Sequence, residues 1–520
     1  MAAKIGQGKR LIVLGAGLSG LSFAHYLRNF SAFYNKSGHV SKIILLEAND
    51  YMGGSVKTHV HEDGLVHELG PRTIRHAGMK GKNTGVLLEQ LGLAGKVLTV
   101  KKASEAGQTR FVYRHGKLHE VPGSPLHIFR KIPGENYRLF RALINDYKTP
   151  KMDLTQYEYE DPPVYDFVKY RFSEAVAEAL VDPLLRGIVA GDVRNLSARA
   201  LVQEILDLEQ QYGSLVKAML KPSPRRQKPD ELFINETRDS KLLIRFQKED
   251  ARSFTISTGL QTIPEHLSNS LLNTNEDGVV SIYNQTKVES IKFNDELDPD
   301  KSPCSVVVET IDGDKVEIDG DQIISTIGSK DLAKILPENH RYNLGYIAEI
   351  DHAPVACVGL EYRNFDSMPP ATKSFGFLTH SKAGSKVLGI AFDTMYAPEL
   401  DKPTGSFRMS CMMGGSWFAE VFGTDDPEKV TVAQMEQIAL TEVEKILGIK
   451  SEPYRTVPFL WKKGIAQYRP GHLAKLAATR ETIKKLGLPL TILGQSYDGV
   501  SINDVIWSAR RAANEFVDSL

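Results

Sequence analysis

The sequence of 520 residues is poor in cysteine, carries no net charge and contains no long apolar segment. Its three widely spaced cysteines, Cys304, Cys357 and Cys411, exclude a disulfide-rich scaffold and a CxxC metal pair, so we expect packing residues in a reducing compartment. Lysine plus arginine equals aspartate plus glutamate at 64 each, so the overall charge gives no sign of a nucleic-acid-binding protein. Without an uncharged apolar run of about 18 residues, no membrane-spanning helix is predicted. The length instead favours two or three domains.

The first acidic residue is Glu47, and the segment before it contains a glycine turn. Residues 10–27 read as a buried strand, a GxGxxG turn and an amphipathic helix. In such a turn Gly15 permits a tight bend, Gly17 lets the backbone approach a pyrophosphate, and Gly20 lets helix and strand pack closely. The amides at the helix N-terminus would then face the phosphates. This pattern predicts a dinucleotide site, with a purely structural βαβ unit as the alternative.

A second strand and a second glycine pair follow. The strand predicted at 42–48 places Glu47 near its end, where the carboxylate can accept hydrogen bonds from ribose hydroxyls. The segment between Gly20 and Glu47 is longer than a βαβ unit requires, and its extra residues 30–40 are predicted to form a surface loop. Gly53 and Gly54 come next, and such bare backbone is typical of an enzyme that lays a flavin along the sheet.

Further along, the pattern predicts more strands and a return to the first sheet. Two extended runs lie within 279–318, the second folded as a hairpin about Gly313, and another buried strand is predicted at 321–328. A strand at 489–493 precedes a glycine turn and a helix that carries Val505, Ala509 and Ala512 on one face. This last unit can return to the N-terminal sheet.

The stretch around Gly53 resembles the flavoprotein amine-oxidase superfamily, with Tyr51 and Ser55 where that superfamily often has arginine or an aromatic residue. The turn LGPR at 69–72, with a second arginine at Arg75, looks like the protoporphyrinogen oxidases, the flavin enzymes of haem synthesis. Other matching blocks extend over the whole chain: DPLLRGIVAGDVRNLSARAL (182–201), STGLQTIPEHL (257–267), MMGGSW (412–417), GIAQYRPGH (464–472) and GQSYDGVSINDVI (494–506).

The resemblance implies FAD as the cofactor. It would be held noncovalently, because the segment GQSYDG lacks the cysteine that tethers flavin in some monoamine oxidases. Arg72 would lie beside the isoalloxazine, where positive charge stabilises an anionic reduced flavin. The backbone at Val288 would contact adenine, unless this residue is a plain β-meander edge. The implied cofactor contacts are Gly15, Ala16, Gly17, Leu18, Ser19, Gly20, Glu47, Ala48, Gly53, Gly54, Ser55, Gly70, Pro71, Arg72, Thr73, Val288, Gln495, Val500, Ser501 and Ile502.

For the reaction, the resemblance implies oxidation of protoporphyrinogen IX to protoporphyrin IX by three flavin-mediated dehydrogenations, with O2 reduced to hydrogen peroxide. Two alternatives from the same superfamily are an oxidase acting on an amine and a polyene desaturase. A noncatalytic FAD-binding scaffold is the alternative from another class. No histidine lies in a nucleophile or metal pattern, and we assign no catalytic base, since hydride transfer to a cofactor depends mainly on alignment.

A porphyrinogen is a large apolar macrocycle with two propionates, so its site should combine apolar surfaces with an arginine. By resemblance, Arg110 would bind a propionate, with a solvated arginine at a strand end as the alternative. The apolar ring-clamping positions could equally be ordinary core residues, and Met412 in particular also fills gaps. The implied substrate-binding residues are Arg110, Gly191, Leu378, Val387 or Leu388, and Met412.

Residues 122–220 show a helical pattern in which apolar residues such as Phe129 and Phe140 alternate with Arg130 and Arg141. In the family this region binds a membrane, and the basic-apolar mixture suits an interface. A solvated helix face is the alternative. The resemblance implies peripheral attachment to the mitochondrial inner membrane.

The expected fold class is α/β plus α+β, with a Rossmann-like FAD-binding domain, a sheet-based substrate domain and a helical membrane-binding insert. The expected partners are protoporphyrinogen IX, O2 and a membrane surface, not nucleic acid; contact with the ferrochelatase step and a homodimer are left open. The predicted boundaries are 1–95, 257–335 and 461–520 for the FAD-binding domain, 96–121, 221–256 and 336–460 for the substrate domain, and 122–220 for the insert.

Overall fold

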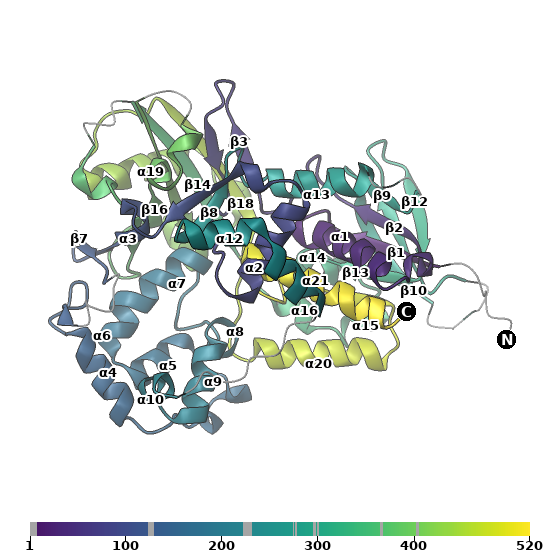
Figure 1. Cartoon of the computed structure of the whole chain (residues 1–520), viewed down its shortest axis with the longest axis horizontal. Coiled ribbons are helices and arrows are strands. Elements are labelled where there is room, and N and C mark those ends of the chain that lie inside the picture. Colours follow the sequence, from purple (N-terminus) through teal and green to yellow (C-terminus); the bar gives the residue numbers. More distant parts are fainter. Residues whose placement is uncertain are drawn as a thin grey trace.

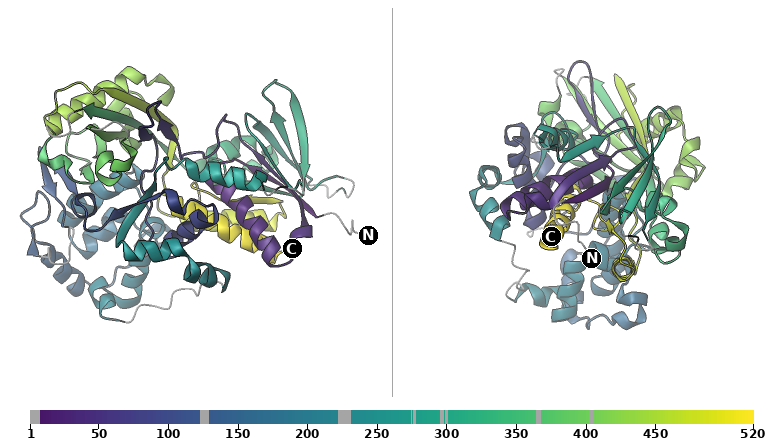
Figure 2. Two further views of the ribbon diagram at one scale, coloured as in Figure 1. Left: turned by 45° about the horizontal axis from the view of Figure 1, so that its top comes forward. Right: turned by 90° about the vertical axis from the view of Figure 1, so that its right-hand side faces the viewer.

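The computed structural model describes residues 8–122, 129–221, 231–273, 275, 278–294, 298, 301–363, 368–401 and 405–520. Within these residues the chain forms a parallel sheet, a larger mixed sheet and a separate group of helices (Figure 1, Figure 2). None of the described helices is long and apolar enough to cross a membrane.

The parallel sheet is assembled from segments far apart in the sequence. Its strand order is β19 (Leu490–Ile492), β13 (Gln322–Ser325), β1 (Lys9–Leu14), β2 (Val40–Leu46) and β9 (Val280–Tyr283). Every neighbouring pair runs parallel. Both faces are covered, which explains why the sequence of β1 and β2 reads as an almost continuous apolar run. The predicted return of the C-terminal strand to the N-terminal sheet is confirmed.

Helices cover one face of this sheet and pack around one core. They are α1 (Leu18–Phe33), α2 (Gly78–Gln90), α11 (Glu231–Asp239), α12 (Lys241–Lys248), α13 (Thr262–Asn273) and α21 (Ile502–Asp518). In α21, Val505 and Ala509 are buried as predicted, followed by Ala513 rather than Ala512. The predicted loop at 30–40 is wrong at its start, because Phe30 is buried and α1 continues to Phe33.

The other face of the parallel sheet is covered by an antiparallel sheet and further helices. These are β10 (Lys287–Phe293), β11 (Cys304–Glu309), β12 (Lys315–Gly320), α14 (Ser329–Ile335), α15 (Glu338–Arg341), α16 (Tyr346–Glu349) and α20 (His472–Lys485). The hairpin about Gly313 is confirmed as β11 and β12. The first extended run is divided, because the chain turns at Gln285, whose φ is +50°, so that β9 joins the parallel sheet and β10 the antiparallel one.

The larger sheet has seven strands in the described chain, all antiparallel to their neighbours except β15 beside β6. In order they are β18 (Arg455–Ala466), β14 (His352–Arg363), β17 (Ser406–Gly414), β16 (Val387–Ala391), β15 (Gly376–Thr379), β6 (Phe111–Arg114) and β7 (Lys117–Glu120). Helices α18 (Phe418–Phe422) and α19 (Val432–Leu447) pack on it and close its apolar core.

Short elements connect the two large sheets. They are the pair β3 (Thr58–Val60) and β4 (Val66–Glu68), the pair β5 (Val97–Lys101) and β8 (Ala251–Ile256), and the helices α3 (Glu105–Gln108) and α17 (Asp393–Tyr396).

The region 129–221 is largely helical, and Figure 1 shows it gathered below the seven-stranded sheet. Its helices are shorter than the sequence pattern suggests: α4 (Leu139–Lys148), α5 (Val164–Arg171), α6 (Glu174–Val176), α7 (Asp182–Val189), α8 (Ala198–Leu201), α9 (Gln203–Tyr212) and α10 (Leu215–Met219). A fully buried guanidinium ties them together, because Arg171 donates to Asp146 at 2.9 Å and to Glu209 at 3.2 Å.

Candidate functional site

The glycine turn after β1 forms the first wall of the site. Gly15 has φ of +94°, which strongly favours glycine, and a Cβ at Gly20 would lie 2.1 Å from the Gly15 carbonyl oxygen. Gly17 is the N-cap of α1 and provides no side-chain cap, so the first amides of this helix remain available. A helix start of this kind attracts phosphate.

The second glycine pair lies against the first. The amide of Gly53 donates to the carbonyl of Ala16 at 3.0 Å, and Gly17 and Gly53 form a parallel bridge. A Cβ built on Gly17 would be 3.8 Å from Gly54 Cα, its nearest protein neighbour. The protein therefore tolerates a side chain at Gly17, but that side chain would occupy the space between two bare backbone segments.

Glu47 follows β2 and is buried beside this turn. One carboxylate oxygen accepts from the Ala16 amide at 3.0 Å, and the other accepts from the Asn49 amide at 2.9 Å. The second oxygen also accepts from the Asn49 side-chain amide at 2.6 Å, whereas the oxygen bound by Ala16 retains a further lone pair for a hydroxyl donor. The Glu47 carbonyl also accepts from the Thr286 amide at 2.8 Å, which brings the strand carrying Val288 to this edge.

Gly70, Ser55 and Gln495 meet although they are widely separated in sequence. A Cβ at Gly70 would lie 2.4 Å from the Ser55 carbonyl oxygen, so only glycine fits this approach without a shift. The Gln495 amide approaches Ser55 Oγ at 3.5 Å and donates to the Gly464 carbonyl at 3.3 Å. Beyond it, Ser501 caps α21 through a capping box with Asp504.

Of the remaining predicted cofactor contacts, most follow directly in sequence from these groups. Leu18 and Ser19 open α1, Ala48 follows Glu47, Val500 packs against two cores, and Ile502 begins α21. The structure thus brings most of the set to one edge of the parallel sheet, from five separate parts of the chain.

Arg72 links the turn at Gly70 to the seven-stranded sheet, since its guanidinium donates to the Gly70 carbonyl at 3.1 Å. It donates to Cys357 Sγ at 3.0 Å and to Met412 Sδ at 3.3 Å, and its Nε lies 3.4 Å from an Asp393 oxygen. Burial alone would lower the pKa of Arg72, but Cys357 and Asp393 raise it above its usual value. No local motif marks Cys357 or Asp393, because each meets Arg72 only after distant strands have paired.

Glu68, four residues before Arg72, belongs to the same buried region. Burial raises its pKa to about 7, against hydrogen bonds from the Leu260 amide at 2.7 Å and the Thr58 hydroxyl at 2.8 Å. No sequence pattern singles out this carboxyl group.

The predicted ring-clamping positions divide between two places. Leu388 and Met412 share a small apolar cluster with Ala190, the neighbour of Gly191. Val387 belongs instead to the core on the other side of the sheet. Leu378 packs against α7, since a Cβ at Gly187 would lie 2.2 Å from one of its methyl carbons. Leu388 rather than Val387 therefore faces Met412.

Arg110 lies apart from this apolar cluster, immediately before β6. Its guanidinium donates to the Gly107 carbonyl at 3.4 Å and lies 5.3 Å from the centre of the Phe375 ring. Burial lowers the pKa of Arg110 to about 10, with further contributions from the positive charges of Arg252 and Arg75. This is a half-buried cation with access to an anion, rather than a freely solvated strand end.

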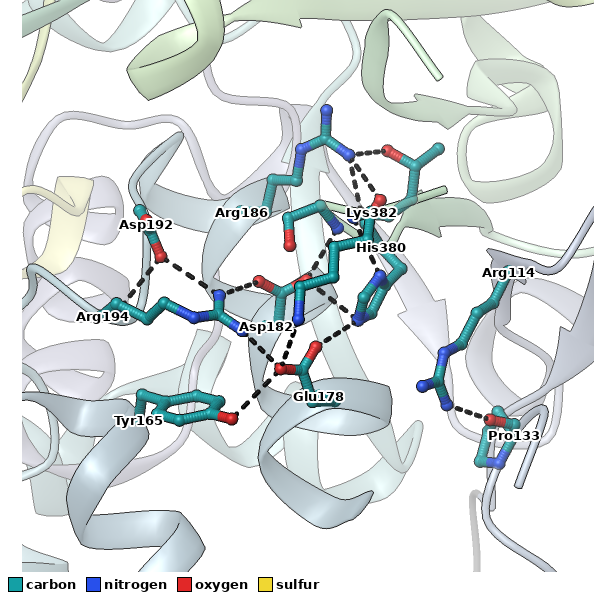
Figure 3. Close-up of polar contacts among 12 residues, drawn as sticks. Arg114, Pro133, Tyr165, Glu178, Asp182, Arg186, Asp192, Arg194, His380 and Lys382 are labelled. Carbon is teal, nitrogen blue, oxygen red and sulfur yellow. Dashed lines mark hydrogen bonds and ion pairs between the residues drawn. The ribbon is translucent and has the colours of Figure 1, made fainter. Parts of the chain in front are cut away.

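A second polar group joins the helical region to the seven-stranded sheet. Figure 3 shows Glu178 between Arg194, Lys382 and His380, which donates to it at 2.8 Å. Arg186 of α7 donates to the Thr379 hydroxyl and the His380 carbonyl, each at 2.8 Å. These contacts fix α7 against β15 and β16.

A cavity of about 450 Å³ opens beside Glu178 and reaches Arg114 and Glu135. Its charged walls are already paired, with Arg114 and Glu135 2.6 Å apart and Lys382 3.1 Å from Glu178. Among the residues that the structure describes, no group of three or more histidine, cysteine or acidic side chains is arranged to hold a metal ion.

Taken together, one edge of the parallel sheet can hold a dinucleotide along bare backbone, and the adjoining sheet offers apolar side chains and an arginine. The glycine cradle fits the diphosphate of FAD, because it leaves a gap that a single Cβ would fill. An elongated flavin in this cradle would extend towards Gly70 and Gln495.

Comparisons with known proteins agree with this geometry. The family model described as "Flavin containing amine oxidoreductase" matches residues 18–516. Protoporphyrinogen oxidase of Bos taurus is 31% identical over 509 residues, covering 98% of both chains, and that of Homo sapiens is 30% identical over 514 residues with the same coverage. The fold is similar to that of a provisionally assigned protoporphyrinogen oxidase from Exiguobacterium sp. 255-15, with a TM-score of 0.74 and 22% identity, covering 99% of this chain and 100% of that one.

Proposed function

The chain belongs to the protoporphyrinogen oxidases of the flavin containing amine oxidoreductase family, and from this membership we propose that it oxidises protoporphyrinogen IX to protoporphyrin IX with FAD in haem biosynthesis. The reaction removes six hydrogens in three steps and reduces three O2 to hydrogen peroxide. The observation that carries the proposal is the pair of facing glycine segments, at Gly17 and at Gly53 and Gly54, joined to a sheet with apolar residues and Arg110.

FAD, when bound, supplies the electron acceptor, and the protein supplies position and electrostatics. The backbone at Gly17 and Gly53 would hold the diphosphate, and Glu47 the ribose. Arg72 brings a buried positive charge, fixed by Asp393 and Cys357, to the junction of the two sheets. Leu388 and Met412 would pack against the macrocycle, and Arg110 would bind a propionate.

The direct test is to add protoporphyrinogen IX aerobically to the purified, flavin-loaded protein and follow porphyrin fluorescence and hydrogen peroxide. We expect both products to form well above autoxidation. Flavin-loaded protein that yields neither product would exclude the activity. An amine offered as substrate under the same conditions serves as the comparison for the alternative within the superfamily.

We further propose noncovalent flavin, because Gln495, Ser496 and Tyr497 offer no cysteine for attachment. Denaturing the yellow protein with acid should release all of the flavin into the supernatant. Flavin that stays with the precipitate would contradict this.

We also propose that the helical region binds a membrane surface peripherally. Ile144 and Tyr147 of α4 lie near Met219 and Leu220 at the end of α10, and the last two are 80% and 77% exposed. Lys217 lies 5.2 Å from the Tyr147 ring and adds a cation to this apolar patch. Apolar side chains next to a cation are favourable at a lipid interface. The inner mitochondrial membrane is the proposed site of attachment.

Vesicle cosedimentation tests this attachment. We expect the double variant Met219→Ser/Leu220→Ser to lose binding to phosphatidylcholine vesicles that contain an anionic phospholipid. Ile311→Ser is the matched control, because Ile311 is 71% exposed but lies on the β11–β12 hairpin, outside the helical region. Equal binding of all three proteins would contradict the proposed surface.

A further inference from the structure

Three arginines gather at the start of β6, although only Arg110 has been considered for the substrate. Arg252 of β8 donates to the Gly107 carbonyl at 2.6 Å, and Arg110 approaches the same oxygen at 3.4 Å. Two guanidinium groups that share one acceptor must lie close together. Arg252 lies on β8 and Arg110 immediately before β6, and these strands belong to different sheets, so the proximity of the two arginines is a product of the fold.

Arg75 is held next to this pair by the backbone. Its neighbour Ile74 exchanges two hydrogen bonds with Phe254 of β8, at 2.8 and 2.9 Å, two residues beyond Arg252. The positive charge of Arg75 contributes to lowering the pKa of both Arg110 and Arg252, after the larger effect of burial. The three side chains thus form one electropositive cluster, which we call the arginine cluster.

The arginine cluster contains no countercharge. Among the described residues, no aspartate or glutamate forms an ion pair with Arg75, Arg110 or Arg252. The fully buried Arg171, by contrast, has such a partner in Asp146. Because a guanidinium stays protonated, three of them side by side repel one another until an anion arrives.

We propose that Arg252 and Arg75 bind the substrate together with Arg110, so that the arginine cluster holds both propionate carboxylates of the porphyrinogen. The inference rests on the proposed function and extends it to the recognition of a dicarboxylate. Each guanidinium can present two parallel N–H donors to a carboxylate, and two carboxylates would offset two of the three charges. A single arginine would leave the second carboxylate without a partner.

Stacked rings connect the arginine cluster to the network around Arg72. Arg110 lies over Phe375, and Phe375 stacks on Tyr396 at 5.3 Å between ring centres. The Tyr396 hydroxyl donates to Asp393 at 2.8 Å, and Asp393 is the partner of Arg72. A chain of side-chain contacts therefore connects the arginine cluster to Arg72, which is one of the proposed flavin contacts.

The test compares protoporphyrinogen IX with its dimethyl ester, which lacks both carboxylates. For Arg252→Ala we expect KM for the free acid to rise about tenfold, the size of one charge-assisted hydrogen bond, with kcat nearly unchanged. Arg75→Ala should raise KM about threefold, because this side chain is exposed and its charge is screened. Neither variant should change KM for the ester by more than about twofold.

Arg511→Ala is the control, since Arg511 is exposed and forms its ion pair with Glu515 on the same helix, α21. Equal losses of Arg252→Ala on acid and ester would assign a structural role and overturn the proposal, as would an unchanged KM for the acid. The second measurement is a fluorescence titration with protoporphyrin IX. If the wild type oxidises neither substrate, the proposed function fails, but the titration still tests whether the arginine cluster binds the porphyrin. An unchanged affinity of Arg252→Ala for protoporphyrin IX would overturn this role of the cluster.

Discussion

The two sides of the site are built in opposite ways. On the dinucleotide side, the functional surface is backbone, and Gly17, Gly53 and Gly70 act by having no side chain. On the substrate side, the surface is made by side chains with buried charges, such as Arg72 beside Asp393 and Arg408 beside Asp401. The first side depends on local turns, whereas the second depends on partners that distant strands bring together.

This difference predicts different consequences of substitution. A small change on the dinucleotide side should affect binding more than stability. Removal of a charge on the substrate side should affect stability first, because it leaves another buried group without its partner.

The largest effect is expected for Arg408→Met. Arg408 is buried, pairs with Asp401 and donates to the Val66 and Ala397 carbonyls. Loss of this side chain should lower the free energy of unfolding by about 3–5 kcal/mol, as measured by urea unfolding. Arg363→Met is the control on the same sheet, since Arg363 is exposed and stacks on Tyr454. A decrease in the free energy of unfolding below about 1 kcal/mol would show that buried Asp401 does not need Arg408 as its partner.

Gly17→Ala tests the opposite side. Alanine has room in the protein itself, because its Cβ would lie 3.8 Å from the nearest backbone atom, but it would enter the proposed FAD space. We expect about a 100-fold weaker Kd for FAD, equivalent to about 3 kcal/mol, with an unchanged melting temperature of the flavin-free protein. Gly95→Ala, where a Cβ meets open space, is the control. Normal FAD binding by Gly17→Ala would place the diphosphate elsewhere.

The same contrast explains what the sequence could predict. The glycine turn, Glu47 after β2 and the hairpin about Gly313 are local patterns, and the structure confirms each of these elements. The division of the first extended run was missed, because two strands that belong to different sheets are separated by one short turn at Gln285.

The contacts of Arg72 were beyond sequence reasoning for a related reason. Cys357 lies opposite Met412 in the pairing of β14 with β17, and this register appears only in the folded sheet. Arg252 and Arg110 likewise meet at the Gly107 carbonyl only after two sheets have formed. No sequence motif around either residue predicts this contact.

Glu68 lies where the two sides meet, and it predicts a pH dependence. Burial raises its pKa to about 7 in the folded protein, so the unfolded chain releases this proton at lower pH than the folded one. The protonated Glu68 therefore stabilises the folded state at low pH. This stabilisation is lost as the pH rises towards the pKa that Glu68 has in the folded protein. Between about pH 5 and about pH 8, we expect the wild type to lose about 2 kcal/mol relative to Glu68→Gln.

Urea unfolding of both proteins at the two pH values measures this difference. Glu515→Gln, on the exposed face of α21, is the control for a glutamate in solvent. A difference between wild type and Glu68→Gln that stays constant with pH would show that Glu68 is ionised throughout.

The smallest effect concerns helix starts. Helix α19, on the substrate side, begins with Thr431, whose hydroxyl accepts from the Gln434 amide at 3.2 Å, whereas α1 begins with an uncapped glycine. Thr431→Ala should cost about 1 kcal/mol of stability without affecting FAD affinity. Thermal unfolding and flavin titration check both expectations, with the exposed Thr441→Ala within α19 as the control. Loss of flavin in Thr431→Ala would show that the two sides are coupled through this helix.

The order of strands in the parallel sheet has a consequence during protein synthesis. β1 and β2 leave the ribosome early, but β13 between β1 and β19 arrives hundreds of residues later, and α21 emerges later still. Until then, the apolar face of α1 that packs against α21 has no cover. A nascent chain must keep this surface from aggregating throughout translation, and a product truncated before residue 490 would expose it permanently.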